Sequence, residues 1–232
     1  MADLVTFRQH DDHSTIVLDD GKVNVLSLAM QAEIAAALDQ AQRAGTPVVV
    51  TGRAGTFSAG FDLRTLRGGG TDAVAMLRGG FELALRLLEF PLPVVAACSG
   101  HALAMASFLL LSVDYRIGAD GQYRIGPNEV AIGLVMPMTA VEICRARLDP
   151  VHFDRAVNSA EIFDPAGAVR AGFLDVVVDE SELAAAASAK AAALGTLDLA
   201  AHAATKLRSR AASLAAIRRG YEEDEAFFAM MG

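Results

Sequence analysis

The amino-acid sequence predicts an α/β fold with a largely parallel sheet, followed by a layer of helices. Three observations carry this prediction. Strand-like and helix-like segments alternate over residues 4–179, short runs within them are almost wholly apolar, and residues 181–229 are alanine-rich and amphipathic. Alternation of this kind is typical of parallel strands covered by helices. A chain of 232 residues is long enough for one large domain, or for a domain with an extension.

The expected strands follow from short apolar runs bounded by turn residues. Residues 4–19 read as a hairpin, because two apolar segments flank the polar link "HDDHS". Buried strands are expected at "PVVVTG" and "LPVVAACSG", and further strands at "DYRIGAD" and "FLDVVVDE". The segment "LRGGGTD" at 66–72 is expected to be a mobile loop, because glycine is poorly suited to element interiors.

The expected helices follow from apolar periodicity and capping residues. A helix should start after Ser27, as its N-cap, and end before Gly45. Further helices are expected at 72–90, 104–113, 137–148, 149–160 and 164–172, and helices again from 181 onward. The alanine-rich faces of this last region could pack on another subunit or only over the chain's own core.

Composition excludes several classes of partner. The net charge of −8 gives no basic stripe for nucleic acid. No apolar run reaches the ~20 residues of a membrane span, so we expect a buried helix at 102–113 and no membrane association. The N-terminal residues lack the pattern of a signal peptide. Cys98 and Cys144 stand in apolar surroundings, which favours reduced thiols in a cytoplasmic protein.

Motifs for metal, nucleotide or serine chemistry are weak. His10 and His13 fall in a polar turn, and the cysteines and histidines lack zinc spacing, so no metal site is expected. The run "CSGH" places Ser99 near His101, but the G-x-S-x-G elbow of serine hydrolases is absent. "TGRAGTFSAG" contains no G-K-[ST] and is therefore no P-loop.

Two small-residue segments and one acid are better candidates. In "FSAGFDL", Ala59 and Gly60 allow a ligand to approach the amide of Phe61. In "SGHALAM" a buried strand leads into a helix, whose first N–H groups are unpaired and partly positive. Two such N–H groups aimed at one carbonyl oxygen make an oxyanion hole. Glu129, in "IGPNEVAIG", lies beside apolar residues that could raise its pKa into a useful range.

These segments, in this order, resemble the crotonase superfamily of enoyl-CoA hydratases and isomerases. "FSAGFDL" is a near-complete match to the first oxyanion motif of the superfamily, and "PVVAACSGHALAMAS" resembles the second. "GKVNVLSLAMQAEIAAALDQA" is similar to its N-terminal segment, "IGPNEVAIGLVMP" to the segment that bears the catalytic glutamate, and "FDPAGAVRAGFLDVVVDESEL" to a later stretch. The resemblance covers nearly the whole chain.

The resemblance implies a crotonase-like spiral of repeated ββα units over residues 1–179. Residues 180–232 would be a C-terminal helical region that covers the active site and assembles trimers, alone or as a dimer of trimers. The substrate would be an acyl-CoA thioester, with coenzyme A as part of the substrate and no tightly bound cofactor. The CoA site would be lined by Lys22, Val23, Val25, Ala59, Gly60, Asp62, Leu63 and Arg64, with Lys22, Arg64 and Arg67 near its phosphates. The thioester oxygen would lie between the amides of Phe61 and Met105, with Glu129 as acid and base.

The sequence departs from the superfamily at the second motif. Three glycines of hydratases are replaced by Ala104, Met105 and Ala106, and Phe108 stands where hydratases carry a second glutamate. Because Phe108 cannot activate water, isomerisation by Glu129 alone is favoured over hydration. Three alternatives stay open: a hydratase proper, a catalytically eroded acyl-CoA-binding protein, and a CoA-thioester hydrolase or C–C lyase. Glu142 could be a second carboxylate, or a surface residue of its helix.

Overall fold

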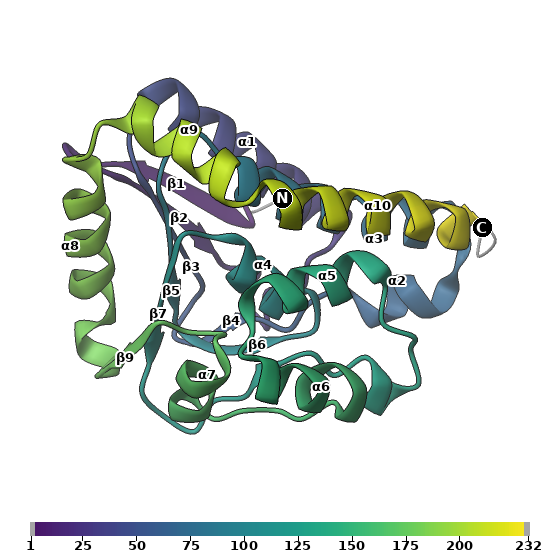
Figure 1. The fold of residues 1–232 in the computed structure, drawn as a ribbon. Coiled ribbons are helices and arrows are strands. Elements are labelled where there is room, and N and C mark those ends of the chain that lie inside the picture. The colour runs from purple at the N-terminus through teal and green to yellow at the C-terminus, as the bar shows by residue number, and fades with distance from the viewer. Residues whose placement is uncertain (1–2, 230–232) are drawn as a thin grey trace.

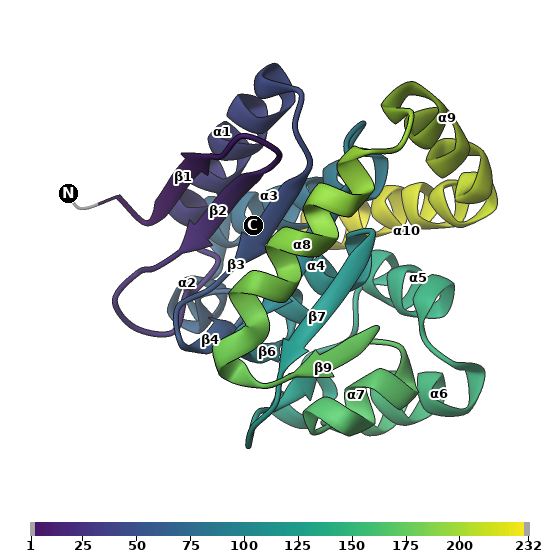
Figure 2. The same ribbon diagram turned by 90° about the vertical axis from the view of Figure 1, so that its left-hand side faces the viewer.

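The computed structural model describes residues 3–229 and shows an α/β fold with two sheets (Figures 1 and 2). The larger sheet has the order β1 (Val5–Gln9), β2 (Ser14–Leu18), β3 (Val48–Thr51), β5 (Val94–Cys98), β7 (Tyr115–Ala119) and β9 (Val176–Val178). The smaller sheet has the order β4 (Gly55–Ser58), β6 (Gly100–Leu103) and β8 (Ile125–Gly126). Within these two sheets every pair is parallel except the predicted hairpin of β1 and β2. The α/β fold class is therefore confirmed.

Each ββα unit contributes one strand to each sheet. Strand β3 leads directly into β4, β5 into β6, and β7 into β8, and a helix follows each pair. The segment "SGHALAM" at 99–105 is not the plain loop that the sequence suggests between strand and helix, because it contains β6, whose first three residues pair with β4. Gly100 permits this pairing, because a Cβ there would lie 2.1 Å from the carbonyl oxygen of Gly55.

Both faces of the larger sheet are buried, which explains the uninterrupted apolar runs. Val48 and Val50 pack into the main core, whereas Val49 faces the second core under helix α8 (Leu183–Gly195). Figure 2 shows α8 lying across this second face of the sheet. Successive side chains of a strand point to opposite faces, so a strand buried on both sides needs apolar residues throughout.

The first helices agree with their capping signals, with one correction. Helix α1 (Leu28–Ala44) starts at the Ser27 hydroxyl, which accepts from the Met30 amide, and ends at Gly45 in the left-handed region. The expected loop at 66–72 is wrong. Helix α2 (Leu63–Gly68) and helix α3 (Gly70–Glu89) meet there with Gly69 between them.

The later helices also begin where predicted. Helix α4 (Met105–Ser112) is buried along its whole length, as its apolar sequence indicates. Helix α5 (Met138–Arg147) follows Pro137, and the Asp-Pro pairs start α6 (Pro150–Ser159) and α7 (Pro165–Ala171), with Asp149 and Asp164 as N-caps. Two short 3₁₀ turns lie at Val130–Ile132 and Glu180–Glu182.

The C-terminal region forms three helices, α8, α9 (Leu199–Ser209) and α10 (Ala211–Ala229). Figure 1 shows α10 lying along α3 and α5 on the side of the molecule away from α8. None of the described helices taken singly is long and apolar enough to cross a membrane. The helices Glu180–Gly195 and Leu199–Ser209, which meet at a bend of 99°, would together have the length and composition of a membrane span.

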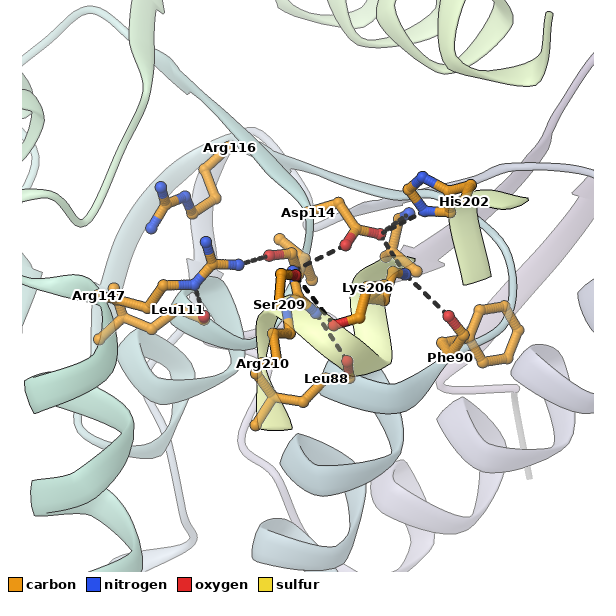
Figure 3. A network of polar contacts seen from close by, with 12 residues as sticks. Leu88, Phe90, Leu111, Asp114, Arg116, Arg147, His202, Lys206, Ser209 and Arg210 are labelled. Carbon is orange, nitrogen blue, oxygen red and sulfur yellow. Dashed lines mark hydrogen bonds and ion pairs between the residues drawn. The ribbon is translucent and has the colours of Figure 1, made fainter. Parts of the chain in front are cut away.

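A charged network joins α9 and Arg210, the residue that follows it, to the core (Figure 3). Lys206 Nζ donates to the carbonyl oxygens of Phe90 and Leu92 at 2.8 and 3.1 Å and lies 2.6 Å from Asp114 Oδ2. Arg210 donates to the Leu88 carbonyl and to the other oxygen of Asp114. These cations cap carbonyls at the end of α3, which would otherwise be unpaired.

Candidate active site

The first backbone site is the turn between β4 and α2. Asn24 is fully buried, and its side-chain nitrogen donates to the carbonyls of Leu18 and Phe57. Ser58 Oγ donates to the Asn24 carbonyl at 2.6 Å and accepts from the Gly60 amide at 3.1 Å. Gly60 has φ +84°, which glycine adopts without strain. This chain of hydrogen bonds sets the direction of the next amide, that of Phe61.

The second backbone site is the start of α4. Ala104 has φ 51° and ψ −130°, a conformation that costs a residue with a side chain about 1–3 kcal/mol. Met105 is already the first helical residue, so its replacement of a glycine leaves the backbone unstrained at that position, and its side chain is fully buried. The strain falls one residue earlier, at Ala104.

The two sites touch each other. A Cβ placed on Gly60 would lie 2.8 Å from the Leu103 carbonyl oxygen and 3.1 Å from the Met105 nitrogen. Within the described part of the chain, neither the Phe61 nor the Met105 amide donates to a protein acceptor. Two unpaired N–H groups on adjoining segments, one at a helix start, can bind one anionic or carbonyl oxygen.

The carboxyl group of Glu129 is buried and lines a cavity that Phe61 and Ala104 also line, whereas Met105 lies outside the lining. The residue is 7% exposed, and its Oε2 atom has no hydrogen-bond partner among residues 3–229. Burial raises the pKa of Glu129 to about 7, against the weaker opposing effect of the Glu129 and Asn128 amides. A carboxyl that titrates near neutrality can both take up and return a proton.

This cavity has a volume of about 370 Å³. Its lining residues are Ala59, Phe61, Leu63, Leu66, Arg67, Leu77, Phe81, Ala104, Phe108, Asn128, Glu129, Ile132, Gly133, Leu134, Val135, Pro137, Phe227 and Phe228. Most of them are apolar, and among these described residues only Arg67, Asn128 and Glu129 offer charged or amide side chains. The volume is that of a small-molecule site.

The chain matches the enoyl-CoA hydratase/isomerase family over residues 14–231. The chain belongs to this family. The solved structure of a probable enoyl-CoA hydratase of Mycobacterium tuberculosis is 45% identical, with 98% of this chain and 97% of that one covered and a TM-score of 0.95. A second structure of the same M. tuberculosis protein, described as an enoyl-CoA isomerase, is likewise 45% identical, with 96% of this chain and 97% of that one covered and a TM-score of 0.92.

Human mitochondrial enoyl-CoA delta isomerase 1 is 32% identical over 166 residues. That match covers 69% of this chain but 55% of the human protein, so the chain spans little more than half of this relative's length. Relatives of this member of the enoyl-CoA hydratase/isomerase family therefore carry both reaction names, and similarity alone leaves the reaction open.

Lys22, Val23 and Val25, which the sequence predicts at the CoA site, lie beside the first backbone site. The amides of Lys22 and Val25 donate to the carboxylate of Asp20, and the Val23 carbonyl accepts from Ala59. Their backbone groups therefore already have partners, and it is the exposed side chains of Lys22 and Val23 that face solvent.

Residues 62–67 divide into capping and lining roles. Asp62 is the N-cap of α2 and accepts from the Arg64 amide. Leu63 and Arg67 line the cavity, whereas Arg64 is exposed and lies outside the lining. Arg53, which the sequence analysis missed, donates to the Lys22 carbonyl and places a further cation beside that residue.

Glu142, in α5, is half-buried, with 18% of its side chain exposed. It pairs with Arg145 at 3.2 Å and does not line the described cavity. The "CSGH" residues form no nucleophilic relay, since Ser99 Oγ donates to the Thr56 carbonyl and His101 Nδ1 accepts from the Arg124 amide. Burial raises the pKa of the Cys98 thiol to about 12. Among residues 3–229 no three His, Cys, Asp or Glu side chains gather as metal ligands do.

A larger open depression of about 530 Å³ lies between α8, α9 and the start of β7. It is lined by the charged network of Figure 3, in which Asp114 pairs with Lys206 and Arg210. Burial and the neighbouring Lys206 lower the pKa of His202 at its edge. Lys206 and Arg210 already pair with Asp114 and with backbone carbonyls. We therefore assign these charged side chains to the stability of the fold rather than to ligand binding.

Proposed function

We propose that the protein is an enoyl-CoA isomerase that moves a double bond along the acyl chain of a CoA thioester. The substrate's thioester oxygen accepts hydrogen bonds from the Phe61 and Met105 amides. The Glu129 carboxylate removes a proton from the α-carbon, and the negative charge passes to the thioester oxygen as a dienolate. The same carboxyl then returns the proton to the γ-carbon, which gives the conjugated 2-enoyl thioester.

Phe108 is the observation that favours isomerisation over hydration. It lines the same cavity as Glu129, and it is 1% exposed and stacked on Phe81. Addition of water requires a group that orients and activates water, and an aromatic ring supplies none. One carboxyl with a pKa near 7 and two amides, each worth on the order of 10²–10³ in rate, suffice for proton transfer through an enolate.

The test compares two substrates. The protein is incubated with a 3-enoyl-CoA and with a trans-2-enoyl-CoA, and each is followed by the absorbance of the conjugated thioester and by mass. We expect conversion of the first without a gain in mass and no water addition to the second. Glu129→Gln should abolish conversion, and Glu142→Gln is the matched control that should retain it. Gain of one water by the 2-enoyl substrate would establish a hydratase.

Two other outcomes would overturn the proposal. Saturable binding of thioesters without turnover of either substrate, and without exchange of the α-proton for solvent deuterium, would make the chain an acyl-CoA-binding protein. Release of free CoA or cleavage of a carbon–carbon bond would make it a hydrolase or lyase.

The assembly, compartment and cofactor are part of the proposal. We expect a homotrimer or a dimer of trimers, supported by exposed apolar side chains such as Val151 at 70% and Leu197 at 48% exposure. Sedimentation velocity tests this. A cytoplasmic location is supported by two buried free thiols, Cys98 and Cys144. The proposed steps use only backbone amides and one carboxyl, so they require no bound cofactor beyond the CoA of the substrate.

A further inference from the structure

One wall of the active-site cavity is made of three stacked phenylalanine rings. Phe81 lies between Phe108 and Phe228, with ring centroids 6.4 Å apart on each side and interplanar angles of 24° and 9°. All three side chains are at most 1% exposed. They come from α3, α4 and α10, so this aromatic wall (Phe81, Phe108 and Phe228) exists only in the folded chain.

The aromatic wall offers nothing to a polar group. The charged and amide side chains of the lining are Arg67, Asn128 and Glu129, and none belongs to the wall. A substrate portion that lies against the wall is therefore hydrocarbon, because a polar group there would lose its hydrogen bonds to water without replacement. This fits the acyl tail of a thioester whose carbonyl is held at the Phe61 amide.

The ring of Phe228 is held in place by the helix that carries it. One turn earlier, the buried carboxylate of Asp224 accepts from the Met138 and Thr139 amides at 2.8 and 2.7 Å, and from the Thr139 hydroxyl at 2.6 Å. These are the first amides of α5, so Asp224 caps that helix from another element. One turn earlier again, Gly220 lets α10 approach, because a Cβ there would lie 2.9 Å from the Met138 carbonyl carbon.

From this geometry we infer that Phe228 ends the acyl pocket and limits the length of the acyl chain that the enzyme accepts. The inference rests on the proposed function and adds a substrate class to it, unbranched acyl groups of medium length. At ~30 Å³ for a water-sized group, the cavity of about 370 Å³ holds roughly twelve such groups. The oxygen and sulfur of the thioester and the two pantetheine carbons next to the sulfur take about four of these groups, which leaves about eight carbons for the acyl chain.

Phe228 rather than its neighbours sets the limit, because the other two rings are fixed by the interior. Phe81 also meets the ring of Phe61 edge-on at 6.3 Å, and Phe108 lies on the wholly buried helix α4. Phe228 lies on an outer helix that Asp224 fastens to α5. Asp224 is a positioning residue. Without it, the affinity for acyl-CoAs should level off over a wider range of chain lengths.

The experiment measures binding of saturated acyl-CoAs, which requires no turnover. Butanoyl-, hexanoyl-, octanoyl-, decanoyl-, dodecanoyl- and hexadecanoyl-CoA are titrated into the full chain by calorimetry. For the natural protein we expect affinity to rise about fourfold per methylene up to about eight carbons and then to stop rising. Phe228→Leu should extend the rise by about one methylene, and Phe228→Trp should end it earlier. Phe173 is a fully buried phenylalanine outside the cavity, so Phe173→Leu is the control. In this variant the break, the chain length at which affinity stops rising, should be unchanged.

Asp224→Asn is expected to fold and to bind the short thioesters with nearly unchanged affinity, while the break at about eight carbons becomes gradual. A break at the same chain length in the natural protein, Phe228→Leu and Phe228→Trp would overturn the inference, as would a continuous rise up to hexadecanoyl-CoA in the natural protein. The outcome is independent of catalysis. A chain-length limit in binding without turnover of any enoyl-CoA would refute the isomerase and leave this inference standing.

Discussion

Replacing Glu129 by glutamine tests the charge of the buried carboxyl. Burial raises its pKa in the folded protein from 4.5 to about 7, whereas in the unfolded chain it titrates at its ordinary value. Between these pH values the folded state holds a proton that the unfolded state has released. The contribution of Glu129 to stability is therefore most favourable below about pH 4.5, and it is lost as pH rises through about 7.

The size of the effect follows from the two pKa values. Each pKa unit corresponds to about 1.4 kcal/mol, so ionisation of Glu129 in its buried site costs about 3 kcal/mol. Glutamine has nearly the same shape and carries no charge at any of these pH values. Between about pH 5 and pH 8, the stability of Glu129→Gln relative to the natural protein should rise by about 2.5 kcal/mol.

Urea unfolding of both proteins at about pH 5, 6, 7 and 8, at constant ionic strength, measures this difference. Glu142→Gln is the matched control, because Glu142 pairs with Arg145 and lies outside the cavity lining, and the stability difference between this variant and the natural protein should stay flat. If the advantage of Glu129→Gln does not change with pH, the carboxyl is not held neutral by burial and the reasoning fails.

Four further outcomes are expected. The kcat/KM of the isomerisation should rise with pH around a midpoint of about 7, because the ionised form of Glu129 takes the first proton. Gly60→Ala should lower stability by about 3 kcal/mol and turnover at least tenfold, since its Cβ would lie 2.8 Å from that of Ala104 at φ +84°. Ala104→Gly should stabilise the chain by about 1 kcal/mol, as relief of strain outweighs the entropy of glycine. Lys206→Met should cost about 3–5 kcal/mol, because it leaves Asp114 short of a buried partner and two carbonyls uncapped.

Kinetics and urea unfolding check these four expectations. A flat pH profile between about pH 5 and 8 would remove Glu129 from the rate-limiting proton transfer. Full activity of Gly60→Ala would show that the approach of the two loops is unimportant. Destabilisation by Ala104→Gly would mean that Ala104 is not strained, and a neutral Lys206→Met would show that Arg210 alone suffices for Asp114 and the helix end.

Local signals in the sequence were sufficient for most helices and strands. Ser27 and Gly45 mark the ends of α1, and the apolar run after Gly100 predicts the buried helix α4, because capping and periodicity act within a few residues. The glycines at 68–70 led to a wrong loop prediction. Leu66 and Val74 pack on the core on either side of them, and this tertiary packing outweighs the low helix propensity of glycine.

Long-range contacts were beyond such signals. The sequence identified the two backbone segments and Glu129 as candidates. It could not predict how close they lie in space, and it did not predict the aromatic wall. Phe81 and Phe228 stack although they are far apart in the chain. Helical periodicity alone did not decide that Glu142 pairs with Arg145 and lies outside the cavity lining.

The sequence by itself therefore determined the α/β class, the helix ends and the chemical types that could bind a thioester. Only the tertiary structure decided that Gly60 meets Met105, that Glu129 is buried, and that Phe228 of α10 lines the same cavity as Glu129. The physical reason is that hydrogen-bonding and capping preferences act along the chain, whereas burial, pKa and cavity shape arise from segments that meet only after packing.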